Sequence, residues 1–156
     1  MELKEFIIKE DIKKKYILDS SVIIKWYYSK NESELRAADY IHNQVLGDKI
    51  IIASPDLILY EIMNFFISKA EIPEEKVGNI LSELNEILFI INTDISIQKK
   101  AFKIARRIKS PIYDSLFLAL SEALDCPLIT ADKRLKLAAS KENYTVFLLS
   151  EFKNLY

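Results

Sequence analysis

Short apolar runs alternate along the chain with longer segments in which apolar residues recur at helical spacing. The short runs are rich in isoleucine, leucine and valine, and they predict buried strands at 15–19, 49–53, 89–92, 127–130 and 144–149. The longer segments predict helices at 22–28, 33–46, 57–70, 73–88, 97–108, 113–124 and 133–140. Prolines near several of the boundaries support them, because proline is favoured in the first turn of a helix and breaks it elsewhere.

This order of elements predicts a fold class. Strands of four to six residues that alternate with helices indicate βαβ units, and such units build a parallel sheet that is covered by helices on both faces. The sequence therefore predicts an α/β protein with three layers (α/β/α) and a central parallel sheet of about five strands. Residues 1–14 do not fit the repeating unit and are predicted to form an N-terminal arm, and residues 15–156 form one domain.

The composition agrees with one folded domain and limits the partners and the cellular compartment that we expect for it. The chain has 156 residues, of which 50% are hydrophobic and 29% charged, and its formal net charge is −1. The chain therefore lacks the overall positive charge that would indicate nucleic-acid binding. No apolar run reaches the roughly 18–20 residues of a membrane span, and we expect no signal peptide and no membrane association. Cys126 is the only cysteine, which excludes a disulfide framework and favours a reducing cytoplasm.

The scarce residues exclude several classes of site. Gly47 and Gly78 are the only glycines, so neither a P-loop nor a dinucleotide-binding turn can be built. His42 is the only histidine, and any nucleophile–histidine pair or multi-histidine metal site would depend on that one residue. Carboxylates must therefore supply most of the chemistry if the chain is an enzyme.

Four acids lie in apolar surroundings: Asp19, Glu61, Asp114 and Asp132. Two of them, Asp19 and Asp132, follow predicted strands, and in open α/β sheets ligands bind outside the carboxyl ends of the strands. A buried carboxylate is costly unless it is paired or holds a metal ion. Four such acids at one edge of the sheet would bind a hard divalent cation such as Mg²⁺ or Mn²⁺.

Each acid also has a simpler structural explanation. Asp19 and Asp132 stand where they can cap the helices that follow them. Asp114 falls in the first turn of a helix, where the helix dipole favours a negative charge. Glu61 lies in the middle of a helix with apolar neighbours, where no capping role is available and a salt bridge is the remaining alternative. From single residues the alternatives stay open, and only the joint pattern favours a site.

The joint pattern resembles the PIN-domain ribonucleases, and in particular the VapC-type toxins of prokaryotic toxin–antitoxin pairs. The resemblance covers about residues 15 to 150 and rests on four stretches in the family's order and spacing: Tyr16-Ile-Leu-Asp-Ser-Ser-Val-Ile-Ile-Lys-Trp26, Pro55-Asp-Leu-Ile-Leu-Tyr-Glu-Ile-Met-Asn64, Ser110-Pro-Ile-Tyr-Asp-Ser-Leu-Phe-Leu-Ala-Leu120 and Leu128-Ile-Thr-Ala-Asp-Lys-Arg-Leu135. By this resemblance, the four acids correspond to the family's catalytic and metal-binding quartet. Ser21 and Thr130 correspond to supporting hydroxyls, and Asn64 to the asparagine of the Glu-x-x-Asn motif. The arm at 1–14 departs from the family pattern.

The resemblance implies a Mg²⁺- or Mn²⁺-dependent endoribonuclease that is inhibited by a cognate antitoxin, with an antitoxin segment in a groove near the acids. It also implies a homodimer. Helices 22–28 and 57–70 support this, because their apolar side chains exceed what one sheet face covers: Ile23, Ile24, Trp26, Tyr27, Phe65, Phe66 and Ile67. Basic residues near two motifs are either solvated or contact phosphates: Arg106, Arg107, Lys109, Lys133 and Arg134. Trp26 and Tyr27 either stack on RNA bases or belong to the core.

Three competing functions fit the sequence less well. A phosphotransfer enzyme of the haloacid-dehalogenase type needs a second aspartate two residues after Asp19, where this chain has Ser21. A receiver domain needs paired acids near the first strand and an acceptor aspartate on a central strand, and neither is present. A non-catalytic binding module with the PIN shape remains the alternative from another class, although the presence of all four acids argues against it.

Overall fold

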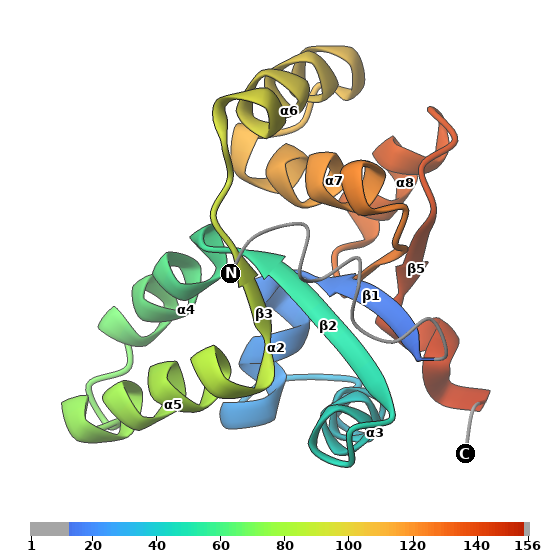
Figure 1. Cartoon of the computed structure of the whole chain (residues 1–156). Helices are drawn as coiled ribbons and strands as arrows, with labels where there is room; N and C mark the ends of the chain where they lie inside the picture. Colours follow the sequence, from blue (N-terminus) through green and yellow to red (C-terminus); the bar gives the residue numbers. More distant parts are fainter. Residues whose placement is uncertain (1–12, 155–156) are drawn as a thin grey trace.

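The computed structural model describes residues 13–154, and Figure 1 shows their arrangement. Within this part of the chain there are five strands: β1 (Lys14–Leu18), β2 (Ile50–Pro55), β3 (Phe89–Ile91), β4 (Leu128–Thr130) and β5 (Val146–Leu148). The α-helices are α2 (Ser20–Tyr27), α3 (Leu35–Leu46), α4 (Leu57–Ile67), α5 (Glu74–Ile87), α6 (Ile95–Ile108), α7 (Ile112–Leu124) and α8 (Lys133–Ser140), and a 3₁₀ helix, η1 (Leu149–Asn154), follows β5. Residues 1–12 of the predicted arm lie outside the described residues, and Lys14 already belongs to β1.

The predicted fold class is confirmed. The five strands form one sheet in the order β3-β2-β1-β4-β5, and every neighbouring pair is parallel. β1 lies at the centre, where Ile17 pairs with Ala53 of β2 on one side and with Leu128 of β4 on the other. These three residues are fully buried, as expected for a strand that is covered on both faces.

The helices form two layers because the chain crosses the sheet in two directions. From β1 to β2 and on to β3 the chain moves toward one edge, and from β3 to β4 and β5 it moves back toward the other. Since crossovers between parallel strands are right-handed, the two directions place their helices on opposite faces. Figure 1 shows α6, α7 and α8 on one side of the sheet and α2, α3, α4 and α5 on the other.

The reversal of direction also fixes where a ligand is expected to bind. The chain leaves β1 toward one side and β4 toward the other, so β1 and β4 flank a topological switch point. Loops at the carboxyl ends of two such strands diverge and leave a crevice between them. Asp19 directly follows β1, and Asp132 comes two residues after β4.

Several boundaries differ from the sequence prediction. Helix α4 ends at Ile67 instead of residue 70, and β5 spans Val146–Leu148 instead of 144–149. After β5 the chain turns into η1, which buries Leu149 completely and packs the Phe152 ring against Tyr16 (centroids 6.2 Å apart). This contact joins η1 to Tyr16 of β1, which is far away in the sequence, so local periodicity does not predict it. No helix between residues 13 and 154 is both long enough and apolar enough to cross a membrane.

The apolar side chains predicted to be exposed on two helices are mostly covered within the chain. Ile23 is fully buried and Phe66 is 5% exposed. Trp26 stacks on His42 with ring centroids 4.3 Å apart, and its indole N–H donates to the carbonyl of Ala38. Of the seven residues in that set, Ile67 alone is exposed, at 79%. The prediction of a broad apolar surface on α2 was therefore wrong, because α3 and α4 cover it.

Candidate active site

Asp19 lies at the end of the central strand and at the start of α2. Its backbone is extended, and its carboxylate accepts from the N–H of Ser21 (3.1 Å), so it caps the helix. The side chain is only 7% exposed. The apolar run that forms β1 thus delivers a carboxylate into the crevice at the switch point while the first turn of α2 holds its orientation.

Two hydroxyl groups hold Asp19 from the neighbouring strand and helix. The hydroxyl of Ser21 donates to one carboxylate oxygen, and the hydroxyl of Thr130 donates to the other. The backbone N–H of Ala131 donates to the Ser21 hydroxyl (2.9 Å), and that of Asp132 donates to the Thr130 hydroxyl (3.0 Å). The supporting roles expected for Ser21 and Thr130 therefore have a geometric basis, since this network ties the end of β1 to the end of β4.

Burial dominates the titration of Asp19. It raises the pKa of this carboxyl from its ordinary 3.8 to about 6, because a charge is poorly solvated there. The hydrogen bonds from Ser21 and Thr130 oppose the increase in pKa by stabilising the ionised form. The negative charges of Glu61 and Asp114 add to the increase, which shows that both acids lie close enough to be felt.

Glu61 and Asp114 reach the same region from two other helices. Glu61 is half-buried on α4, and its pKa is raised by burial and by the charge of Asp114, while a hydrogen bond from Ser20 acts in the opposite direction. Asp114 lies in the first turn of α7, and its pKa is raised by burial and by the charge of Asp132, against a hydrogen bond from Ser110. Asp114 is therefore coupled to each of the other three acids.

Asp132 completes the set and also caps α8. Its Oδ1 accepts from the N–H groups of Arg134 (2.8 Å) and Leu135 (3.3 Å), so the structural explanation offered from the sequence describes its geometry correctly. The same is true of Asp19 and α2. Capping and membership of an acidic cluster are not alternatives here, because a helix that begins at the carboxyl edge of the sheet places its cap in the crevice.

Asn64 is the remaining residue predicted from the sequence, and two serines near the acids were not predicted. Asn64 is exposed on α4, one turn beyond Glu61. Ser20 and Ser110 were not singled out from the sequence, yet each donates a hydrogen bond to an acid of the cluster. Only their positions relative to the acids could have indicated them, because Ser20 directly follows Asp19 and Ser110 precedes Asp114 by about one helical turn.

The donor set fits a hard divalent cation. All four side chains offer carboxylate oxygens, and no histidine or thiol belongs to the cluster. Within residues 13–154, no three His, Cys, Asp or Glu side chains are arranged so that they enclose a metal ion. In proteins, Mg²⁺ usually keeps several waters and takes one or two carboxylates together with substrate phosphates.

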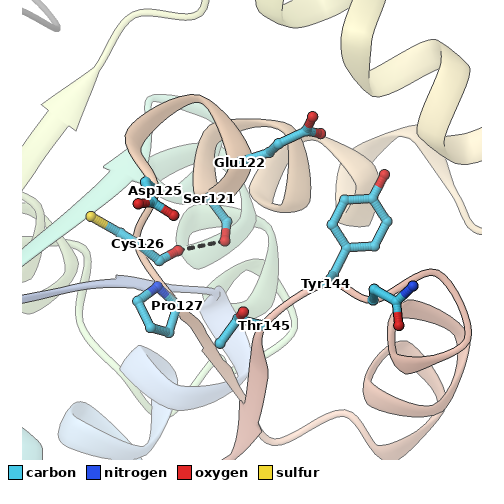
Figure 2. Close-up of a pocket in the computed structure, with 8 residues that line it drawn as sticks. Ser121, Glu122, Asp125, Cys126, Pro127, Tyr144 and Thr145 are labelled. Atoms are coloured by element: carbon cyan, nitrogen blue, oxygen red, sulfur yellow. Dashed lines mark hydrogen bonds between the residues drawn. The ribbon is translucent and has the colours of Figure 1, made fainter.

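A pocket of about 230 Å³ lies away from the acids, at the opposite ends of the strands (Figure 2). It is lined by Ser121, Glu122, Asp125, Cys126, Pro127, Asn143, Tyr144 and Thr145. Pro127 and Thr145 directly precede β4 and β5, so the pocket lies at the amino ends of these strands, whereas the acids lie at the carboxyl ends. The hydroxyl of Ser121 donates to the carbonyl of Cys126 (2.5 Å) and closes the chain turn there. This pocket is not part of the candidate active site.

Known proteins match this chain over most of its length. A curated relative, ribonuclease VapC3 of Pyrobaculum aerophilum, is 27% identical over 126 residues, which is 78% of this chain and 92% of the relative. Among solved structures, PAE2754 from Pyrobaculum aerophilum matches with a TM-score of 0.63 and 16% identity, covering 91% of this chain and 94% of the other. VapBC2 from Rickettsia felis, bound to a promoter DNA fragment, matches with a TM-score of 0.61 and 16% identity over 86% of this chain and 98% of the other.

A third structure, FitAcB from Neisseria gonorrhoeae, matches with a TM-score of 0.63 and 15% identity, again over 86% of this chain and 98% of the other. These structural likenesses support the fold described above. The family model of the PIN domain matches residues 16–141, which include the four acids and both supporting hydroxyls. By its sequence and its fold, this chain belongs to the PIN-domain family.

Proposed function

We propose that this chain is a Mg²⁺- or Mn²⁺-dependent endoribonuclease that acts as the toxin of a toxin–antitoxin pair. The observation that carries the proposal is the gathering of Asp19, Glu61 and Asp132 around Asp114, whose charge interacts with each of them, at the switch point of a PIN-domain sheet. The similarity to ribonuclease VapC3 supports RNA as the substrate.

The carboxylates supply the ligands for the cation. We assign Asp19 and Asp114 as direct or water-mediated ligands, because Asp19 is the most buried of the four acids and the charge of Asp114 acts on it. Glu61 and Asp132 complete the binding site. A bound Mg²⁺ or Mn²⁺ supplies a water activated for attack and positive charge at the scissile phosphate.

Side chains of this protein then orient the Asp19 carboxylate and transfer the proton. Ser21 and Thr130 keep the Asp19 carboxylate in one orientation, because each donates a hydrogen bond to one of its oxygens. Glu61 has a raised pKa, which suits a group that accepts a proton from the attacking water and returns it to the leaving oxygen. In the proposed hydrolysis, a water oxygen bonds to phosphorus, the bond between phosphorus and the leaving ribose oxygen breaks, and one proton moves to that oxygen.

Exposed basic residues near the acids supply phosphate contacts. Lys133 and Arg134 form the first turn of α8, directly after Asp132, and both are exposed. Arg106, Arg107 and Lys109 lie near the end of α6, shortly before Asp114, and are also exposed. These local cations allow a chain with a net charge of −1 to bind RNA close to its carboxylates.

We further propose a cognate antitoxin and a homodimer as partners, in the cytoplasm, where RNA substrates and antitoxin are made. The VapBC2 and FitAB assemblies among the structural neighbours support the antitoxin. A candidate contact surface is the groove of about 660 Å³ between α4 and α5, lined largely by apolar side chains that include Met63, Ile67 and Leu81. Light scattering of the purified chain at micromolar concentration tests the dimer, and co-purification with the product of an adjacent small gene tests the antitoxin.

The nuclease assignment is tested with purified protein and end-labelled single-stranded RNA in Mg²⁺, in Mn²⁺ and in chelator. We expect cleavage only with the divalent ions, and we expect Asp114→Asn to abolish it. Asp125→Asn is the matched control, because Asp125 is an exposed acid at the other end of the same helix. Its left-handed backbone (φ 50°) also accepts asparagine readily.

Thermal melts separate a lost ligand from a lost fold. Asp114→Asn should melt in chelator at or above the temperature of the parent, because it removes one of several repelling charges. Mn²⁺ at about a hundred times its dissociation constant should stabilise the parent by about 2.7 kcal/mol, and Asp114→Asn should lose much of that gain. Undiminished cleavage by Asp114→Asn would remove Asp114 from the site, and cleavage in chelator would refute the metal requirement.

A further inference from the structure

The outer face of α6 exposes two large apolar side chains. Ile95 is 65% exposed and Phe102 is 57% exposed, whereas Ile97, Ala101 and Ile104 on the opposite face are buried. Ile95 and Phe102 line an open groove of about 340 Å³ together with Gln98, Lys99 and Lys103. In Figure 1 this helix lies outermost on its side of the sheet, beyond α7. No described part of the chain fills the groove.

The same helix concentrates positive charge. Between Ile95 and Ile108 it carries no acid and five basic residues: Lys99, Lys100, Lys103, Arg106 and Arg107. Lys100 is paired with Glu122 of α7 (3.5 Å), but within residues 13–154 no ion pair is recorded for Lys99, Lys103 or Arg106. The guanidinium carbon of Arg106 lies 5.7 Å from the centroid of the Phe102 ring. Within the described residues, the Phe102 ring therefore lies beside cations that have no ion-pair partner.

The chain connects this face directly to the acidic cluster. Lys109 and Ser110 join α6 to α7, the hydroxyl of Ser110 donates to Asp114, and α6 and α7 pack side by side. Phe102 precedes Ser110 by eight residues, which is about 12 Å along a helix axis at 1.5 Å per residue. A single-stranded nucleic acid with its scissile phosphate at Asp114 can reach Phe102 within a few nucleotides.

We propose that the outer face of α6 binds the single-stranded RNA that flanks the cleavage point. One base stacks on the Phe102 ring, and the neighbouring phosphates contact Lys99, Lys103 and Arg106. This inference rests on the proposed nuclease function and deepens it, because it assigns a substrate-binding surface that lies outside the acids.

Charge and size favour RNA over a protein on this surface. A two-fold dimer through this face would bring each cation-rich helix against its own copy, so the like charges would repel. The exposed apolar part consists of two side chains, which is small for the buried core of a protein interface. One exposed ring flanked by cations is instead the arrangement with which proteins hold an unpaired base between two phosphates.

The test measures RNA binding without cleavage. A fluorescein-labelled single-stranded RNA of twelve nucleotides and mixed sequence is titrated with the full chain in chelator, and the dissociation constant is read from fluorescence anisotropy. The variants are Phe102→Ala, Phe102→Tyr and the double variant Lys99→Gln/Lys103→Gln. The controls are Leu137→Ala, which removes a similarly exposed apolar side chain (63%) from α8, and the double variant Lys76→Gln/Lys141→Gln, which removes exposed lysines elsewhere.

Phe102→Ala should weaken binding about tenfold, within the range for loss of one base–aromatic stack, and Phe102→Tyr should restore it. Lys99→Gln/Lys103→Gln should lower the slope of log Kd against log salt by about 1.4, because two phosphate contacts on a single strand are lost. Both controls should bind like the parent. In cleavage assays, Phe102→Ala should raise KM for long RNA and leave kcat near that of the parent, as expected for lost binding away from the reacting atoms.

Three results would overturn this proposal. The first is a parent chain that does not bind the RNA, and the second is binding by Phe102→Ala within twofold of the parent. The third is a lower mass of Phe102→Ala than of the parent in light scattering, which would make the face a protein interface. The outcomes are separable from the nuclease assignment, since binding that depends on Phe102 without any cleavage would refute the nuclease and leave this surface intact.

Discussion

The raised pKa of Asp19 predicts a pH dependence of stability that one substitution should remove. Folding raises the pKa of this carboxyl from 3.8 to about 6, so between these values the folded chain holds a proton that the unfolded chain has lost. Since stability falls with rising pH wherever the folded state binds more protons, this group stabilises the fold below about pH 4 and loses that contribution as the pH rises through 6. Asp19→Asn has no proton to lose and should show no such decline.

The size of the effect follows from the shift. About two pKa units correspond to about 3 kcal/mol at 1.36 kcal/mol per unit. For a chain of this length, 3 kcal/mol changes the melting temperature by about 6–12 °C. Asparagine keeps a carbonyl oxygen that can accept from the N–H of Ser21, so the cap of α2 should survive. Some of this contribution is already lost at pH 4, so the stability of Asp19→Asn relative to the parent should rise by about 2.4 kcal/mol between pH 4 and pH 7.

The assay is urea denaturation of both proteins, followed by circular dichroism in chelator at half-unit steps from pH 4 to pH 7.5. The difference between the two free energies of unfolding removes the contributions of the titrating groups that do not interact with Asp19. Asp125→Asn again serves as the control and should follow the parent at every pH. A difference between Asp19→Asn and the parent that is flat across the window would refute the reasoning, since it would mean that Asp19 is as well solvated in the folded chain as in the unfolded one.

Two further predictions concern the groups that hold the site together. Thr130→Val removes the hydroxyl that donates to Asp19 and leaves the Asp132 N–H unpaired, so it should lower the free energy of unfolding by about 1–3 kcal/mol and move the pH window of Asp19 upward, and Thr130→Ser should restore both in the same denaturation series. Asp132→Ala should lose about 1 kcal/mol with the cap of α8 while Asp132→Asn keeps the cap, yet both should lose RNA cleavage, and normal cleavage by Asp132→Asn would show that Asp132 is a cap only.

Local patterns predicted most of the fold because the strands are buried on both faces and the helices are amphipathic. A continuous β-branched run such as the one at 49–53 predicts a strand that is buried on both faces. The structure has β2 at Ile50–Pro55. The errors fall where distant residues decide. The chain after β5 packs Phe152 near Tyr16 in place of a longer strand, and Trp26 of α2 is covered where it packs against His42. Neither contact leaves a trace in the spacing of apolar residues.

The acids of the site were predictable one by one, but their coupling was not. A lone acid in an apolar run is visible in a sequence, and so is its position after a strand. The charge of Asp114 acts on Glu61 only because α4 and α7 approach the crevice from opposite sides of the sheet. The hydrogen bonds from Ser20 and Ser110 follow from the same approach, and serines are too common in a chain for their position alone to single them out.

The pairing of β1 with β4 builds the hydrophobic core and the candidate site in one step. Leu18 pairs with Ile129, and the next residues along the chain are Asp19 and Thr130, whose side chains then hydrogen-bond although 111 positions separate them in the sequence. The apolar pairs stabilise the sheet, and this stability offsets the cost of bringing Asp19 out of water beside other negative charges. Because the acids repel one another, they do not gather by their own interactions, and the burial of their apolar neighbours must hold them together. Substitutions that loosen the β1–β4 pairing should therefore separate the acids before they unfold the chain, so that activity is lost at a temperature where most of the helical structure remains.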